Sequence, residues 1–306
     1  MRADAVLVVA FGGPTRAEEI RPFLANVLRG RPVPPERVED VVRHYEAIGG
    51  RSPLNEITVR QAERLRAALE AIGSPLPVYV GMRNWEPYLA GTLARMADAD
   101  VRRAVGVVLS PHACEASRER YTEAIDAARH ALRARAPEIA YIAPWYDHPL
   151  FTTAVADAVT AALVAVPPAA RASTPVVFTA HSIPVAMAER SSYAAEIATT
   201  ARAVATRLGR ERWEIAYQSR SGSPREPWLE PDVNDVIRRL AAGGAADVVV
   251  APIGFVADHV EVLYDLDVEA RATAAAAGIG FARASAVNDH PLFVQMLAER
   301  VRDAAG

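Results

Sequence analysis

The chain has 306 residues, of which 51% are hydrophobic and 23% charged, a composition typical of a globular protein with room for two ordinary domains. Its net charge of −3 at pH 7 gives no basic footprint for nucleic acid. Cys114 is the only cysteine, which excludes an internal disulfide and any metal site built from several thiolates of this chain.

The N-terminal residues 1–4 lead directly into the first apolar run and leave no room for a secretory signal. No apolar run reaches the roughly 18 residues that a membrane helix needs. We therefore expect a cytoplasmic protein without stable membrane insertion.

Short runs rich in valine and isoleucine alternate along the chain with longer alanine- and arginine-rich stretches of helical character. These runs predict strands at Ala5–Ala10, Val78–Gly81, Ala104–Leu109, Ile139–Ile142, Val176–Thr179, Glu214–Gln218, Asp247–Pro252 and Phe281–Arg283. Strands separated by helices predict an α/β fold in which mainly parallel sheets are covered by helices on both faces.

The second half of the chain repeats the first. The segment Asp147–Phe151 recurs at Asp289–Phe293, an offset of 142 residues, and Glu86–Leu89 is echoed by Glu226–Leu229, an offset of 140 residues. Such near-equal offsets indicate two similar Rossmann-like lobes with a cleft between them. We place the first lobe at residues 1–115, the second at 116–286, and expect a C-terminal helix in 287–306 to pack back on the first lobe.

The repeated segments have a local explanation. An aspartate two residues before a proline is typical of a helix start, with the carboxylate capping free amide groups. We therefore expect Asp147 and Asp289 to cap helices, and interpret His148 and His290 as structural.

The first lobe contains about 30 residues more than the second between its first strand and its Glu-Pro segment. A helix in this excursion is predicted by the spacing of its apolar residues, Val38, Val41, Val42 and Tyr45, and we interpret it as a lid or wall over the cleft. Arginines near its ends are candidates to hold ligand carboxylates: Arg29, Arg31 and Arg51.

His181 lies two residues after the end of the predicted strand Val176–Thr179. Ligands of open α/β sheets bind beyond the carboxyl ends of the strands, so a histidine there is placed to accept a proton at neutral pH. A histidine that only caps a helix or bonds to backbone is the alternative interpretation.

Glu261, Asp265 and Glu269 lie four residues apart, which stacks them on one face of a helix or along a π-type bulge. Three stacked acids repel one another unless a cation or a bound proton lies among them. The row begins soon after Asp258-His259 at the end of a buried strand, so we expect it to face the cleft. A solvated acidic face is the alternative.

The Gly12-Gly13-Pro14 turn lacks the third glycine of a dinucleotide fingerprint and the lysine of a phosphate loop. We interpret it as a tight turn that lets a flat ligand approach the backbone. Aromatic residues near strand ends are candidates to line an apolar slot: Phe11, Trp85, Tyr88, Tyr121, Trp228 and Tyr264.

Five segments, in order and over nearly the whole chain, resemble the ferrochelatase family: Ala10–Pro14, Tyr45–Leu54, Thr179–Pro184, Tyr217–Ser219 and Pro252–Asp265. The resemblance implies a heme-biosynthesis enzyme that inserts ferrous iron into a porphyrin in a cleft between two parallel-sheet lobes. The chain is most similar to the bacterial coproporphyrin branch, so coproporphyrin III is the favoured substrate and protoporphyrin IX the second.

The resemblance also implies roles for single residues. His181 and Glu261 would bind the incoming metal and take up the pyrrole protons, and Asp265 and Glu269 would pass metal in or protons out. Porphyrin contacts would come from Phe11, Arg29, Arg31, Ser52, Asn84, Tyr121 and Trp228. Phe11 stands where some relatives have a tyrosine able to ligate iron, and Asn84 is not a good base.

We expect ferrous iron as substrate and no permanently bound cofactor, because the iron leaves with the product. A lone Cys114 cannot hold an iron–sulfur cluster. Expected partners are the porphyrin, ferrous iron and, transiently, neighbouring enzymes of the heme pathway, and we assume a monomer. Alternatives are a cobalt or nickel tetrapyrrole chelatase, a two-lobed ligand-binding protein or a glycosyltransferase.

Overall fold

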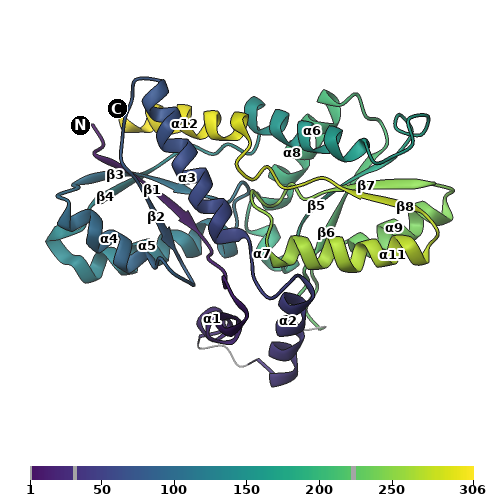
Figure 1. The fold of residues 1–306 in the computed structure, drawn as a ribbon, viewed down its shortest axis with the longest axis horizontal. Helices are drawn as coiled ribbons and strands as arrows, with labels where there is room; N and C mark the ends of the chain where they lie inside the picture. The colour runs from purple at the N-terminus through teal and green to yellow at the C-terminus, as the bar shows by residue number, and fades with distance from the viewer. Residues whose placement is uncertain (1, 30–32, 222–224) are drawn as a thin grey trace. The chain divides into compact units, whose positions relative to one another are not determined.

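The computed structural model describes residues 2–29, 33–221 and 225–306. The chain forms two compact units (Figure 1). Unit 1 comprises Met1–Ser110, Ala116–Pro144 and Asp289–Gly306, and unit 2 comprises Pro111–Glu115 and Trp145–Asn288. Each unit contains one four-stranded sheet in which every neighbouring pair is parallel.

The two sheets have the same strand order, with the first strand of each unit between its second and third. In unit 1 the order is β2-β1-β3-β4, from β1 (Ala5–Ala10), β2 (Val78–Met82), β3 (Arg103–Val108) and β4 (Glu138–Tyr141). In unit 2 it is β6-β5-β7-β8, from β5 (Val176–His181), β6 (Trp213–Gln218), β7 (Asp247–Ala251) and β8 (Gly280–Arg283). All eight predicted strands are present, with ends within two residues of those predicted, and the α/β fold is confirmed.

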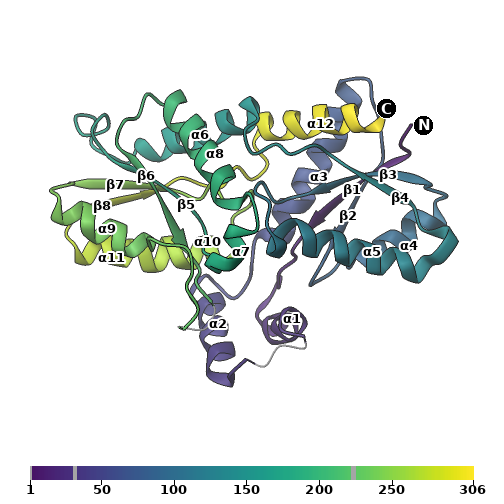
Figure 2. The same cartoon turned by 180° about the vertical axis from the view of Figure 1, so that it is seen from behind.

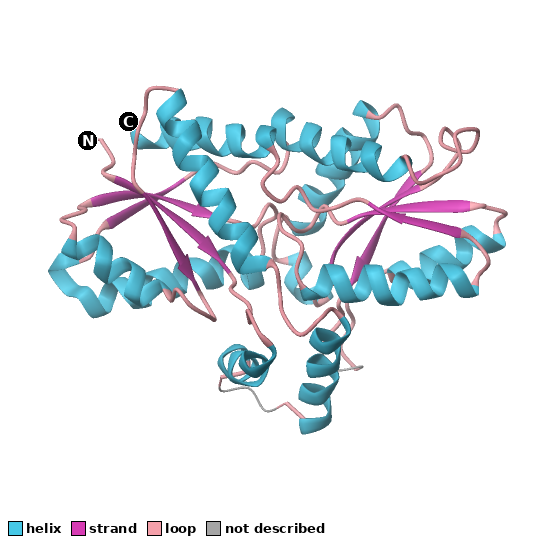
Figure 3. Ribbon diagram, viewed as in Figure 1, coloured by secondary structure: helices cyan, strands magenta, loops and turns pink. Residues whose placement is uncertain are grey.

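Helices cover both faces of each sheet (Figures 2 and 3). Unit 1 has α3 (Leu54–Ala71) and α12 (Pro291–Ala305) on one face, α4 (Leu89–Asp98) and α5 (Arg120–Leu132) on the other, and α1 (Ile20–Val27) and α2 (Pro35–Ala47) outside these layers. Unit 2 has α6 (Pro149–Leu163) and α8 (Tyr193–Arg207) on one face and α9 (Val233–Ala242) and α11 (Arg271–Ala276) on the other, with the short α7 (Val185–Glu189) and α10 (Val260–Val262). A π-helix, Leu263–Ala270, joins α10 to α11.

The unit boundary differs from the predicted one. Residues Ala116–Pro144, predicted in the second lobe, belong to unit 1 because β4 pairs with β3 along Arg103–Gly106, and Pro111–Glu115, predicted in the first lobe, belong to unit 2. At the C-terminus, α12 packs against α3 and β3 of unit 1. The excursion contains the predicted helix as α2, whose Val42 and Tyr45 are buried; its role as a lid remains a prediction.

One of the sequence echoes was aligned wrongly. The amide of Met82, at the end of β2, donates to the carbonyl of Pro87, and the amide of Tyr217 in β6 donates in the same way to Pro231. The counterpart of Glu86-Pro87 is therefore Glu230-Pro231, not Glu226-Pro227. The offset of 140 residues paired Glu86-Pro87 with a similar Glu-Pro that lies four residues before the structural counterpart.

The helix caps also differ from the prediction in detail. The Nδ1 atoms of His148 and His290, rather than the carboxylates of the preceding aspartates, accept from the amides of Leu150 (3.2 Å) and Leu292 (3.3 Å). The residue directly before the proline is the N-cap, because the proline occupies the first helical position. Both histidines are structural, as interpreted.

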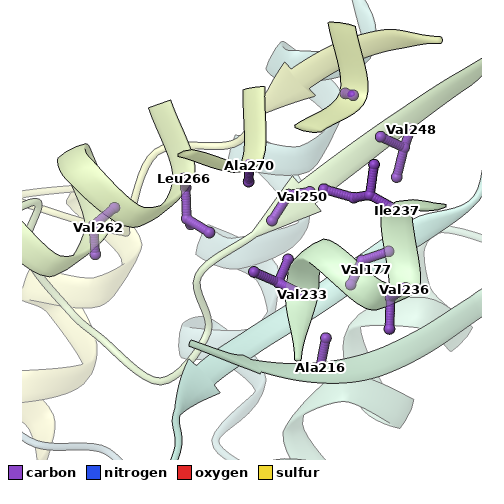
Figure 4. Packing of buried hydrophobic residues seen from close by; sticks show 11 residues of the cluster. Val177, Ala216, Val233, Val236, Ile237, Val248, Val250, Val262, Leu266 and Ala270 are labelled. Atoms are coloured by element: carbon purple, nitrogen blue, oxygen red, sulfur yellow. The ribbon is translucent and has the colours of Figure 1, made fainter. Parts of the chain in front are cut away.

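The core of unit 2 positions the segments discussed below. Val177, Val248 and Val250 of the sheet pack against α9 and against Val262 and Leu266, which lie at the start of the acidic row (Figure 4). Burying these branched side chains contributes roughly 1.5–3 kcal/mol each. The inner face of the α10–π-helix segment is thus fixed against the sheet.

Gly254, in the loop after β7, allows that loop to touch the end of β5. Its amide donates to the Thr179 carbonyl (3.0 Å), and a Cβ at this position would lie 2.7 Å from the Cα of Ala180. We expect Gly254→Ala to lower the free energy of unfolding by about 1–3 kcal/mol, because two backbone segments must separate.

Gly91→Ala is the matched control. Gly91 lies in α4 with nothing within 4 Å of an added Cβ, so alanine should be neutral or stabilising by up to about 1 kcal/mol. Urea unfolding of both variants tests this, and equal effects would contradict the close approach at Gly254.

No helix in the described part of the chain is both long and apolar enough to span a membrane.

Candidate active site

Polar side chains gather at the carboxyl ends of three adjacent strands of unit 2. His181 is the last residue of β5 and pairs in register with Gln218, the last residue of β6. Glu261 lies on α10, after the loop that follows β7. This edge of a parallel sheet is where such folds bind ligands.

His181 and Glu261 face each other. The Nε2 atom of His181 lies 3.7 Å from Oε1 of Glu261, and Nδ1 of His181 donates to the Ser182 carbonyl. Because the Ser182 carbonyl accepts a hydrogen bond from Nδ1–H, the neutral imidazole keeps its proton on Nδ1 and has its free electron pair on Nε2, on the side of Glu261. The side chains are 26% and 41% exposed, so a ligand can reach both.

The two groups shift each other's pKa. Burial alone lowers the pKa of His181, but the Glu261 carboxylate and the bond to Ser182 outweigh it, so the pKa lies above its ordinary value of 6.5. Burial alone raises the pKa of Glu261, yet the adjacent His181 brings it down to about 2. At neutral pH the pair therefore holds an anionic carboxylate beside an imidazole that readily binds a proton.

Asp265 differs from Glu261 although both belong to the same acidic row. Burial, together with the like charges of Glu261 and Glu269, raises the pKa of Asp265 to about 7, even though the Ser219 hydroxyl donates to this carboxylate and works against the shift. Burial and the nearby Asp232 raise the pKa of Glu269 as well. Asp265 can thus gain or lose a proton close to neutral pH.

The π-type geometry expected for this row is present, since Asp265 and Glu269 lie on the π-helix Leu263–Ala270. Among the described residues no group of three histidine, cysteine or acidic side chains is placed to hold a metal ion together. An ion at His181 and Glu261 would therefore take its remaining ligands from elsewhere, such as a bound substrate.

The raised pKa of Asp265 predicts a pH-dependent stability. A carboxyl with a pKa of 3.8 unfolded and about 7 folded binds more protons in the folded state between these values, so stability falls as the pH rises through this window. Asp265→Asn removes this loss. Between pH 4 and pH 8 we expect the free energy of unfolding of the variant to rise by about 1–3 kcal/mol relative to that of the wild type.

Urea unfolding at both pH values measures this difference. Asp100→Asn, a change of an exposed carboxylate, controls for the loss of one negative charge. A difference between Asp265→Asn and wild type that stays constant with pH would contradict the raised pKa.

The other predicted site residues lie mainly in unit 1. Phe11 follows β1 and is 36% exposed, with its ring edge-to-face on Phe23 at 6.3 Å between centroids. Asn84 is buried, and its side-chain amide and backbone amide both donate to the Phe11 carbonyl. Asn84 thus shapes the loop that carries Phe11.

Ser52 and Tyr121 are buried in unit 1. The Ser52 amide donates to the Pro14 carbonyl, and its side chain packs on Gly13, where a Cβ would lie 3.0 Å away. Tyr121 belongs to the core beneath α4 and has the Arg83 guanidinium 5.9 Å from its ring centroid. Their roles toward a porphyrin remain predictions.

Arg29 is exposed and donates to the Asn26 side chain (3.0 Å). Arg31 lies outside the described residues. In unit 2, Trp228 forms a bridge with Pro184, three residues after His181, so it lies beside the loop that leaves β5. The structure thus brings His181, Glu261, Asp265 and Trp228 into one unit.

Sequence reasoning gave no role to four residues around the pair. Gln218 and Ser219 bond to Glu261 and Asp265, His259 caps α10 by accepting from the Glu261 amide (3.1 Å), and the Tyr193 hydroxyl donates to the His181 carbonyl (3.0 Å). Gln218 and Ser219 carried a detectable signal, because Gln218 ends a strand and Ser219 directly follows it. Tyr193 carried none, since an aromatic residue at a helix start predicts only packing.

Known proteins match this chain over nearly its whole length. The family model described as Ferrochelatase matches residues 3–305. The coproporphyrin III ferrochelatase of Mycolicibacterium paratuberculosis is 47% identical over 304 residues, which cover 98% of this chain and 88% of that protein. The protein of the same name from Mycobacterium leprae is 44% identical, with 98% and 89% covered.

Among solved structures, SirB from Bacillus subtilis with Fe3+ superposes with a TM-score of 0.61 at 14% identity, covering 99% of this chain and 95% of that one. The sirohydrochlorin chelatase SirB from Bacillus subtilis subspecies spizizenii, in complex with cobalt, gives a TM-score of 0.56 at 13% identity, covering 98% and 94%. These two share the chelatase fold. With the family model matched from end to end and curated relatives at 44–47% identity, the chain belongs to the ferrochelatase family.

Proposed function

We propose that this enzyme inserts ferrous iron into coproporphyrin III, as a step of heme biosynthesis. The observation that carries the proposal is the His181–Glu261 pair, a proton acceptor 3.7 Å from a carboxylate at the ligand edge of the sheet. Its occurrence in a chain 47% identical to a coproporphyrin III ferrochelatase supports this substrate.

The chemistry needs a base and an anionic metal ligand together. Two pyrrole protons must leave the porphyrin, and iron must exchange its waters for nitrogen ligands. In this proposal the Nε2 atom of neutral His181 accepts the two pyrrole protons one after the other and passes the first on before it accepts the second. The Glu261 carboxylate, with a pKa of about 2, stays anionic to guide iron and to stabilise the imidazolium that forms each time.

Asp265 is proposed to accept the proton from the His181–Glu261 pair and to release it away from the porphyrin. Its pKa of about 7 lets it accept and release a proton at neutral pH, which Glu261 does not. Glu269, with its raised pKa, continues the row. The porphyrin itself is proposed to contact Phe11, Arg29, Arg31, Ser52, Asn84, Tyr121 and Trp228.

Anaerobic mixing of the protein with ferrous iron and one of two porphyrins tests the function. Loss of free-base porphyrin fluorescence is followed with coproporphyrin III and with protoporphyrin IX. We expect saturable iron insertion with a higher kcat/KM for coproporphyrin III. Preference for protoporphyrin IX would reject the proposed substrate, and insertion into neither would reject the proposed reaction.

We also propose that the enzyme works in the cytoplasm, without a resident cofactor, and exchanges porphyrin through transient contacts with neighbouring enzymes of the pathway. Cell fractionation, metal analysis of the purified protein and crosslinking in cells test these three statements separately.

A further inference from the structure

Gln218 is a buried polar residue that bonds both to β5, which carries His181, and to α10, which carries Glu261. It ends β6 and is only 1% exposed. Its Nε2 donates to the backbone carbonyl of Glu261 (2.7 Å), and its Oε1 accepts from the Thr179 hydroxyl in β5 (2.8 Å). Its side-chain amide therefore links the strand that carries His181 to the helix that carries Glu261.

The backbone of Gln218 adds to this link. The Gln218 carbonyl accepts a hydrogen bond from the amide of Ser182 (2.7 Å). The carbonyl of Ser182 in turn accepts a hydrogen bond from Nδ1 of His181. Gln218 thus bonds directly to the peptide that orients the imidazole and to the peptide that carries the carboxylate.

Glu261 lies in the first turn of the continuous helical stretch that α10, the π-helix and α11 form together. The helix α10 spans three residues, Val260–Val262, and continues into a π-helix. The two backbone groups of Glu261 are bonded by side chains: the amide by His259 Nδ1 and the carbonyl by Gln218. The Glu261 peptide at this helix start is thus held by two side chains, next to Val262, which is packed in the core.

We propose that Gln218 is a positioning residue that sets the spacing between His181 and Glu261 during iron insertion, an inference that rests on the proposed function. It touches neither iron nor porphyrin in this account and acts only through the two peptides. A displacement of about 1 Å in a reacting group can cost about 10²-fold in rate, so this bond controls turnover.

The test compares Gln218→Met, a change of similar volume without polar atoms, with wild type in anaerobic iron insertion into coproporphyrin III. We expect kcat to fall by about 10- to 100-fold with little change in KM for the porphyrin. We also expect the acid limb of the pH–rate profile to move to lower pH, because a displaced Glu261 no longer raises the pKa of His181 as far.

Thr174→Val is the matched control. It removes one buried hydrogen bond, from the Thr174 hydroxyl to the Ala170 carbonyl, near the opposite end of β5. We expect a comparable loss of unfolding free energy in urea with kcat and the pH–rate profile of wild type. A Gln218→Met enzyme that behaves in the same way would overturn the inference.

Gln218→Glu covers the case that the methionine variant does not fold. An ionised glutamate still accepts from Thr179 but no longer donates to Glu261, so we expect a folded enzyme with reduced kcat. Wild-type kcat in this variant would overturn the inference. Wild-type protein that inserts no iron would instead reject the proposed function.

Discussion

His181→Ala and Glu261→Gln are each expected to lower kcat for iron insertion by about 10²- to 10⁴-fold, since a positioned base contributes rate enhancements of this size. Alanine removes the imidazole whose Nε2 lies 3.7 Å from Glu261, and glutamine keeps the volume of Glu261 but removes the charge. With Glu261→Gln the pKa of His181 should also fall, because the carboxylate is what raises it against burial. Anaerobic fluorescence kinetics over pH 5–9 measure both effects.

Two exposed residues serve as controls for these variants. His130→Ala on α5 and Glu70→Gln on α3 remove the same chemical groups from the surface of unit 1. They should leave kcat within twofold of wild type. A His181→Ala enzyme as active as His130→Ala, with an intact fold by circular dichroism, would remove His181 from the mechanism.

Arg283→Met is expected to produce the largest loss of stability, about 3–5 kcal/mol. Arg283 is 13% exposed and bonds two carboxylates, Asp258 (Nη1–Oδ1 2.9 Å) and Asp267 (Nε–Oδ2 2.9 Å). Without the guanidinium, the largely buried Asp258 carboxylate loses its cation, and Asp267 keeps only the more exposed Arg271 at 3.3 Å. Asp258 precedes α10 and Asp267 lies on the π-helix, so the variant should lose iron insertion as well.

Arg238→Met tests whether any arginine pair would behave in this way. Arg238 bonds Asp235 at 2.7 Å, but both side chains are at least 60% exposed. Its removal should change the unfolding free energy by less than about 1 kcal/mol. Guanidinium unfolding compares the two, and a similar small effect of both would contradict a structural role for Arg283.

The strands could be predicted because fully buried parallel strands are continuous apolar runs, as Ala5–Ala10 and Val176–Thr179 illustrate. The pairing of β4 could not, since Glu138–Tyr141 alternates exposed and partly buried residues and its partner is set by the sheet. For the same reason residues 116–144 were assigned to the wrong side of the boundary.

The site was predictable where a polar residue follows a strand, as with His181, and where spacing repeats, as with Glu261 and Asp265. It was not predictable where a role depends on a distant partner. Asp258 lies three residues before the acidic row, but its carboxylate bonds Arg283, 25 residues away. Gln218 bonds Glu261 across 43 residues of sequence, and no local pattern encodes such a contact.

The most direct test of this account is anaerobic iron insertion into coproporphyrin III by wild type and by the double variant His181→Ala/Glu261→Gln, measured side by side with the iron porphyrin product identified by mass spectrometry. The account predicts saturable product formation by wild type and a double variant that loses little more than either single variant, because the two residues act as a unit. Equal product formation by wild type and the double variant, or none by wild type, would contradict it.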